Sequence, residues 1–338
     1  MSHPRAIIFG CEGTVLGEQE RAFFADANPL GFILFARNVD TPDQVRALTR
    51  DLRASVGRDD APILIDQEGG RVQRIKPPHW RDVPPPGTFA DLHRINPEAG
   101  IEAATLNARL IAADLIDLGV DVDCLPVLDV PQPESHPFLK GRAAGQDAEQ
   151  ASILGQAACD GLMSGGVMPV IKHIPGHGRA TADSHHDLPR VDASLQDLEQ
   201  VDFAPFRDLS HIPWAMTAHI VYTALDADEP ASTSAHIIEN VIRGQIGFQG
   251  FLVSDDIGMN ALSGTIVERA EACFAAGSDA ILHCNDLEHR EAVAAIAPAM
   301  SDQSMRRFEQ ARASLPAPAA LDKHAALDRL NTLMSESA

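Results

Sequence analysis

The sequence is poor in aromatic residues and in cations, and each shortage excludes a class of partner. Phenylalanine, tryptophan and tyrosine together make up 5% of the chain. A long groove that stacks successive sugars on aromatic faces is therefore not expected. The formal net charge is −21, from 27 lysines and arginines against 48 acids, and such an excess repels nucleic-acid backbones and anionic lipid surfaces. We expect a small-molecule ligand, with no nucleic-acid or membrane partner.

Paired cysteines and long apolar runs are also lacking. The five cysteines are scattered and form no CxxC pair, so the sequence indicates neither a disulfide framework nor a zinc ribbon. No stretch approaches the roughly 18 apolar residues of a membrane span, and no cationic segment with a following apolar run opens the chain. We expect a cytoplasmic, monomeric protein that needs no cofactor.

What the chain does contain is a repeated alternation of short apolar runs and longer helical segments. The apolar runs are residues 6–9, 31–35, 62–65, 120–127, 167–171, 214–218, 250–253 and 279–282. The helical segments are 43–56, 98–118, 147–163, 195–209, 235–245 and 266–276. This alternation predicts a parallel sheet covered by helices, and eight units favour a closed (β/α)8 barrel over a doubly wound sheet. We expect one domain, residues 1–338, with terminal helices from about residue 300 packed on the barrel.

In such a barrel the functional residues lie directly after the strands, in the loops at their carboxyl ends. Polar or ionisable residues follow nearly every predicted strand. They are Arg37, Asn38, Asp66, Glu68, Arg71, Asp129, Lys172, His173, His219, Asp255, Asp256, His283 and Asn285. The sequence therefore predicts a polar pocket at this end of the barrel.

The densest group of reactive side chains is the segment 172–187, KHIPGHGRATADSHHD. Gly176 and Gly178 predict a sharply turning loop. Asp183 and His185 stand two residues apart, so the carboxylate can bond one imidazole nitrogen while the other faces a substrate. The same segment also allows a metal site or a solvated structural turn. The histidines available as metal ligands are His173, His177, His185 and His186.

Two acidic segments complete the candidate site. Asp255 and Asp256 directly follow a buried run, which gives a carboxylate the fixed position that a nucleophile requires. Either acid is also able to cap the next helix, and we expect Asp255 to face the barrel axis and Asp256 to support the loop. In the segment 66–74, Asp66 is suited to accept hydrogen bonds from adjacent sugar hydroxyls. Glu68 is expected to form an internal ion pair with an arginine.

Together these motifs resemble bacterial β-N-acetylglucosaminidases of glycoside hydrolase family 3, the cytoplasmic enzymes of cell-wall recycling. The matching segments are ILFARN (33–38), DQEGGRVQR (66–74), LPVLDV (125–130), KHIPGHGRATADSH (172–185), AHIVY (218–222) and FLVSDDIGM (251–259). They occur in family order and span nearly the whole chain. The combination of KHxPGHG with a following DSH is specific to this group.

The resemblance implies a retaining exo-β-N-acetylglucosaminidase that acts on GlcNAc-1,6-anhydroMurNAc, with or without peptide, through a covalent glycosyl-enzyme intermediate. It implies that Asp255 is the nucleophile, that His185 is the acid/base and that Asp183 orients His185. The sugar-binding residues that it implies are Asp66, Arg74, Arg142, Lys172 and His173. The segment around Arg142, GRAAG, lacks the aromatic residue usual in the family.

Three other functions stay open. One is a phosphorylase of the same family, because a histidine acid/base repels incoming phosphate less than a carboxylate does. Another is a metal-dependent barrel hydrolase built on the histidines, although no HxH follows the first predicted strand. The third is a barrel that binds a sugar without hydrolysing it.

Overall fold

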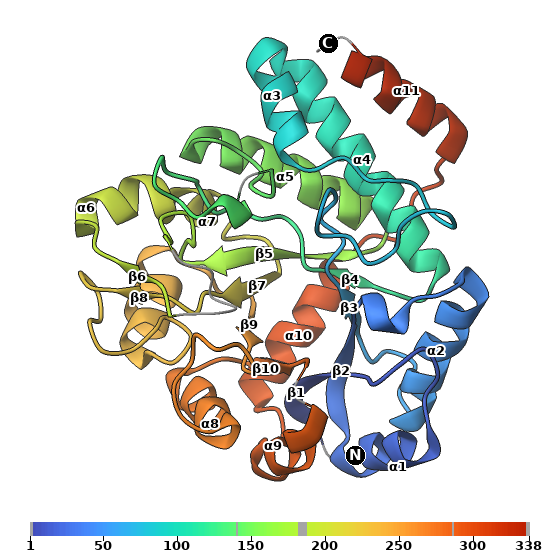
Figure 1. Ribbon diagram of the computed structural model, residues 1–338, viewed down its shortest axis with the longest axis vertical. Coiled ribbons are helices and arrows are strands. Elements are labelled where there is room, and N and C mark those ends of the chain that lie inside the picture. The colour runs from blue at the N-terminus through green and yellow to red at the C-terminus, as the bar shows by residue number, and fades with distance from the viewer. Residues whose placement is uncertain (1–2, 140, 182–187, 286, 336–338) are drawn as a thin grey trace.

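The computed structural model describes residues 3–139, 141–181, 188–285 and 287–335, and a closed barrel of eight parallel strands lies at its centre (Figure 1). Around the barrel the strands follow the order β1-β10-β9-β7-β5-β4-β3-β2. They are β1 (Arg5–Gly10), β2 (Pro29–Leu34), β3 (Ile63–Ile65), β4 (Val122–Asp123), β5 (Met168–Ile174), β7 (Trp214–Thr217), β9 (Phe251–Asp256) and β10 (Ala280–His283). Each predicted apolar run overlaps one of these strands, and the predicted (β/α)8 barrel is confirmed.

Adjacent residues of a strand face opposite sides of the barrel wall, and both sides are buried. Ile8 of β1 packs in the same apolar cluster as Met216 of β7, inside the barrel. Its neighbours Ile7 and Phe9 belong to the outer cluster, where the Phe9 ring lies 6.1 Å from the ring of Phe24 in α1 (Glu18–Ala27). Burial on both faces explains why the strands are continuous apolar runs rather than alternating ones.

Helices surround the barrel (Figure 1). They include α2 (Pro42–Ser55), α3 (Gly87–Ile95), α4 (Pro97–Asp117), α5 (Ala148–Ser164), α8 (Ile266–Ala276) and α9 (Arg290–Ile296). Their ends are fixed by local side chains and backbone geometry. The Thr41 hydroxyl accepts the N–H of Gln44 at the start of α2, and Gly277, at φ 107°, ends α8 in the left-handed conformation. None of these helices, nor any other in the described part of the chain, is long and apolar enough to cross a membrane.

The single helix predicted over 195–209 is divided into three pieces. α6 (Leu195–Asp197) leads into a π-helix, η3 (Leu198–Asp202), and α7 (Ala204–Asp208) follows. Pro205 explains the division. In an unbroken helix it would remove a hydrogen bond, whereas in the first turn of α7 its missing N–H leaves no partner unpaired. The helix predicted over 235–245 is likewise a π-helix, η4 (Ile237–Gln245).

The predicted strand 120–127 contributes only the short β4 to the barrel. Pro126 has no N–H to donate, which interrupts the ladder. The chain nevertheless continues beside β5, where the N–H of Leu128 donates to the carbonyl oxygen of Lys172 (2.8 Å). This course brings Asp129 next to the end of β5.

One end of the barrel is covered by the chain's own terminal segment (Figure 1). In α10 (Asp302–Ser314), the ring of Phe308 lies 6.0 Å from Trp214 and 5.8 Å from Phe251, the first residues of β7 and β9. α11 (Lys323–Ser335) packs on α4 outside the barrel. The amino-terminal end of the barrel is thus closed, and the carboxyl end carries the loops.

Short elements at or beyond the strand ends are η1 (Ala36–Asn38), η2 (Pro137–Leu139), η5 (Leu287–His289) and the parallel pair β6 (Arg190–Val191) and β8 (Val221–Tyr222).

Candidate active site

A cavity of about 500 Å³ lies at the carboxyl ends of the barrel strands. Its polar lining consists of Asp66, Glu68, Arg71, Arg74, Arg142, Lys172, His173, His177, Asp255, Asp256 and Asn285. Apolar side chains such as Phe35, Phe138, Met216 and Met259 complete the walls. The size suits a small ligand, and the dense polar lining suits one rich in hydroxyl groups.

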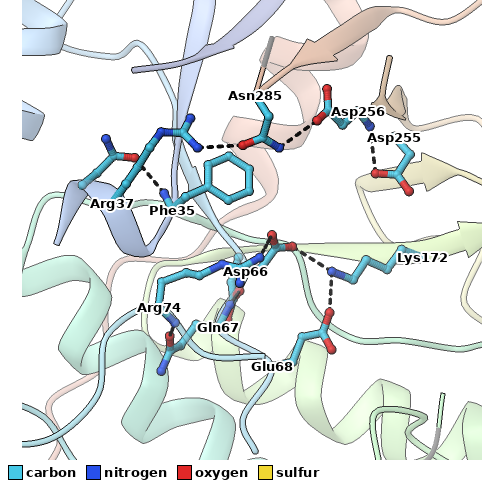
Figure 2. A network of polar contacts seen from close by, with 12 residues as sticks. Phe35, Arg37, Asp66, Gln67, Glu68, Arg74, Lys172, Asp255, Asp256 and Asn285 are labelled. Atoms are coloured by element: carbon cyan, nitrogen blue, oxygen red, sulfur yellow. Dashed lines mark hydrogen bonds and ion pairs between the residues drawn. The ribbon is translucent and has the colours of Figure 1, made fainter. Parts of the chain in front are cut away.

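Lys172 lies at the centre of the polar lining, in β5. Its side chain is 2% exposed, and Nζ lies 2.9 Å from Asp66 Oδ1 and 2.7 Å from Glu68 Oε1 (Figure 2). Burial alone would lower the pKa of the amine, but the two carboxylates outweigh it and hold the pKa of Lys172 above its ordinary value. Lys172 therefore stays charged and ties two carboxylates together.

Each of the two carboxylates also binds an arginine. Arg74 donates from Nη2 to Asp66 Oδ2 at 2.9 Å, while Arg142 donates to Glu68 through Nη2 (2.7 Å) and Nε (2.8 Å). Burial would raise the pKa of both acids. Lys172 and the arginines reverse this, lowering the pKa of Glu68 to about 2 and that of Asp66 below its usual range. The internal ion pair expected for Glu68 is present, and its arginine is Arg142.

Another buried carboxylate, that of Asp129, positions two histidines. Its Oδ2 lies 2.7 Å from His173 Nδ1, and its Oδ1 accepts the backbone N–H groups of His173 (3.0 Å) and His177 (2.6 Å). Burial would raise the pKa of Asp129, but the histidines lower it to about 2. Burial also lowers the pKa of His177 to about 4, so this ring is neutral at pH 7. The ionised Asp129 thus orients the His173 ring, with Nδ1 as its partner.

The two acids at the end of β9 differ in their surroundings. Asp256 is buried, and its carboxylate accepts the backbone N–H groups of Gly258 (3.0 Å) and Cys284 (3.1 Å) and the side-chain amide of Asn285 (3.0 Å). Asp255 is partly exposed and lines the cavity, and its Oδ1 accepts the N–H of Asp256 at 2.8 Å. Asp256 thus joins the ends of β9 and β10, while Asp255 faces the cavity.

Figure 2 shows two chains of polar contacts in the lining. One joins Arg74, Asp66, Lys172 and Glu68. The other runs from Asp255 through Asp256 to Asn285, whose Oδ1 accepts Arg37 Nη1 at 2.6 Å. Both chains border the same cavity.

Asp183 and His185 lie outside the described residues, but both limbs of their loop are described. On the incoming limb, Gly176 has φ 134°, and a Cβ there would lie 2.9 Å from the Cβ of Asp202. Only glycine fits this position. The Gly176 carbonyl oxygen accepts the hydroxyl of Tyr222 (2.7 Å), and Arg179 Nε lies 2.6 Å from Asp202 Oδ2.

The outgoing limb is held by the strand that carries Tyr222. The N–H of Val221 donates to the carbonyl oxygen of Pro189 (3.1 Å), and the N–H of Thr223 donates to that of Val191 (3.1 Å). Tyr222 is the single tyrosine of the sequence. Its hydroxyl holds one limb and its strand holds the other.

The metal interpretation depends in part on His185 and His186, which the structure does not describe. Within residues 3–139, 141–181, 188–285 and 287–335, no group of three or more histidine, cysteine, aspartate or glutamate side chains is arranged to hold a metal ion. His173, a candidate ligand, uses Nδ1 to contact Asp129.

The sequence placed Asp129, Asn285 and Arg37 at this end of the barrel but indicated no role for them. Each follows a predicted strand, and that position was their only signal. Their roles depend on partners far along the chain: Asp129 contacts a histidine 44 residues away, and Arg37 contacts Asn285 at a separation of 248 residues.

The fold and site define a TIM-barrel enzyme with a polar pocket at the carboxyl ends of its strands, an arrangement suited to the hydrolysis of a glycoside. Residues 15–316 match the model of the glycosyl hydrolase family 3 N-terminal domain. The chain belongs to this family. It is a glycoside hydrolase of the β-N-acetylhexosaminidase class, in line with the relatives and structures that it resembles.

Curated relatives and solved structures agree over most of the chain. A β-hexosaminidase of Alkalilimnicola ehrlichii is 38% identical over 294 residues, which cover 86% of this chain and 82% of the relative. One of Chromobacterium violaceum is 37% identical over 316 residues, 92% of this chain and 87% of the relative. The crystal structure of NagZ from Neisseria gonorrhoeae in complex with N-trifluoroacetyl-D-glucosamine matches with a TM-score of 0.88 and 29% identity, covering 99% of this chain and 100% of that one.

Proposed function

We propose that the protein is a retaining exo-β-N-acetylglucosaminidase that removes terminal N-acetylglucosamine from peptidoglycan fragments. The proposed substrate is GlcNAc-1,6-anhydroMurNAc, with or without its peptide, and the proposed location is the cytoplasm. The observation that carries the proposal is the shared cavity of Asp255 and the Asp66–Lys172 pair. A carboxylate on a rigid strand end borders a floor of charged donors and acceptors, as a glycosidase with one bound sugar ring requires.

In this proposal the floor of the cavity binds the terminal sugar. Asp66 is ionised, so it accepts hydrogen bonds from two neighbouring hydroxyls. Lys172, Arg74, Arg142 and His173 supply donors. Because these donors are already held by Asp66, Glu68 and Asp129, little conformational entropy is lost when the sugar binds.

The chemistry follows two steps. Asp255 attacks the anomeric carbon and forms a covalent ester while His185 donates a proton to the leaving oxygen. His185 then takes a proton from water, which attacks the same carbon and releases Asp255, so the configuration is retained. Asp183 stabilises the imidazolium form of His185 and orients its ring.

Trapping the intermediate tests the proposal. The protein is incubated with a fluorinated N-acetylglucosaminyl donor, digested, and analysed by peptide mass spectrometry. The expected adduct is on Asp255 and is missing in Asp255→Ala. Turnover without any adduct would instead indicate attack by the acetamido oxygen of the substrate. Formation of N-acetylglucosamine 1-phosphate in phosphate buffer would identify a phosphorylase.

A further inference from the structure

Arg71 projects into the cavity from a tight turn between Gly69 and Val72. The backbone N–H groups of these two residues donate to each other's carbonyl oxygens at 3.0 and 3.2 Å. Gly69 and Gly70 have φ of 102° and 56°, conformations that favour glycine. The turn therefore fixes the direction in which the Arg71 side chain leaves the backbone.

The guanidinium of Arg71 is held in place by Phe138. Nη2 donates to the Phe138 carbonyl oxygen, and the Arg71 guanidinium carbon lies 5.9 Å from the centre of the Phe138 ring. A cation over an aromatic face and a carbonyl bond restrict the side chain without neutralising its charge. Arg71 is thus an ordered cation in the cavity wall.

Arg71 differs from the other three cations of the cavity. Lys172, Arg74 and Arg142 each bind Asp66 or Glu68. In the described part of the chain, Arg71 contacts no carboxylate. Across the whole chain acids outnumber cations by 48 to 27, yet the cavity lining holds four of each. The site therefore keeps one cation available to an anionic ligand inside a strongly acidic protein.

The position of Arg71 between the floor and the mouth of the cavity indicates which part of a substrate it contacts. Glu68 and Lys172 are buried at the floor, whereas Arg71 is exposed. An enzyme that removes terminal sugars holds that sugar at the closed floor, and its glycosidic oxygen then points to the mouth. The leaving group lies beside the exposed wall, next to Arg71.

We propose that Arg71 binds a carboxylate on the leaving group and so selects substrates whose second sugar is anionic. This rests on the proposed function, in which the lactyl group of the leaving sugar either ends in a free carboxylate or is joined through an amide to a peptide that ends in a carboxylate of its own. A guanidinium presents paired donors that match the two oxygens of a carboxylate. The partners of Arg71 here are a carbonyl and a ring, so a ligand carboxylate displaces no ion pair.

The test uses two substrates that differ only in charge: GlcNAc-1,6-anhydroMurNAc as the free acid and as its methyl ester. We expect the wild type to prefer the acid. In Arg71→Gln, kcat/KM for the acid falls about five- to tenfold, a size at the upper end for an ion pair at an exposed position, and that for the ester changes less than twofold. Arg71→Lys retains part of the preference, because the charge stays while the paired geometry is lost.

Arg50→Gln is the matched control, since it removes the same charge from an exposed position on α2, outside the cavity. It leaves both rates unchanged. Equal losses for acid and ester in Arg71→Gln, or no loss for either, would overturn the proposal. A failure of the proposed function is distinguishable, because the wild type would then hydrolyse neither substrate.

Discussion

The two halves of the candidate site are built differently. The strand half comprises Asp66, Glu68, Lys172 and Asp255, which lie on or shortly after barrel strands. Short ion pairs join Lys172 to Asp66 and Glu68. The loop half leaves β5 at Gly176 and returns at β6, and the described limbs are held by contacts from Tyr222 and Asp202. In the proposed mechanism, the barrel holds the sugar and carries the nucleophile Asp255, and the loop carries the proton donor His185.

The largest expected effect is at Asp255, the proposed nucleophile. Asp255→Ala lowers kcat by about 10⁴-fold or more, because the covalent step is lost while the sugar-binding floor remains. Azide fits the vacated space and restores turnover as a glycosyl azide. Steady-state kinetics with and without azide measure this, and Asp302→Ala, an exposed acid on α10, serves as the control. Near-normal activity of Asp255→Ala would remove Asp255 from the mechanism.

Lys172→Met removes the buried cation that joins Asp66 and Glu68 in the strand half. It leaves Asp66 and Glu68 without their shared cation, and losing one partner of a buried network costs about 3–5 kcal/mol of unfolding free energy. Lys323→Met removes a cation from the exposed pair with Asp114 and costs about 1 kcal/mol or less. Urea unfolding of both variants checks the contrast. Equal destabilisation of the two variants would mean that the buried network contributes no more to the unfolding free energy than a surface ion pair does.

The ion pair of Arg179 with Asp202, which holds the incoming limb of the loop, predicts that the unfolding free energy depends on pH. Burial raises the pKa of Asp202 to about 6 in spite of Arg179. Between about pH 4 and 6 the folded protein therefore keeps a proton that the unfolded chain has lost, so the unfolding free energy falls as the pH rises through this window. The decrease in unfolding free energy across this window is about 2–3 kcal/mol, and it is missing in Asp202→Asn, whose side chain does not titrate. Urea unfolding from pH 4 to 7 tests it, and parallel profiles for the two proteins would contradict it.

The smallest change is the loss of one hydroxyl. Tyr222→Phe removes the hydrogen bond to the Gly176 carbonyl oxygen, which costs about 1 kcal/mol. We expect the incoming limb to be held less well, so kcat falls several-fold for a substrate with a poor leaving group. A dinitrophenyl glycoside, which needs no protonation, is hydrolysed at the normal rate. Equal losses on both substrates would show that Tyr222 does not act through the proton donor.

The barrel was predictable because its signal is local. Eight apolar runs, each buried on both faces, recur with helical segments between them. The helix α1 gave no such signal, because only three of its residues are buried. The π-helices η3 and η4 were predicted as ordinary helices. In η4 the buried residues Ile237, Ile238, Val241 and Ile242 recur at a spacing of four, which an α-helix also shows over so short a segment.

The position of the candidate site was predictable, but its pairings were not. The rule that functional residues follow barrel strands selected Asp66, Lys172 and Asp255. The bond between Arg142 and Glu68 spans 74 positions and depends on how two loops fold together. The sequence does not indicate directly that two residues so far apart along the chain are in contact in the folded protein.

The division between the two halves is tested most directly by His185→Ala, assayed on the disaccharide and on a dinitrophenyl glycoside. We expect a loss of about 10²–10⁴-fold on the disaccharide, as for removal of a general acid, and a far smaller loss on the activated substrate. Covalent labelling of Asp255 should persist in this variant. Equal losses on the two substrates would contradict the role of His185 as proton donor, because the residue would then contribute to sugar binding and not to proton transfer.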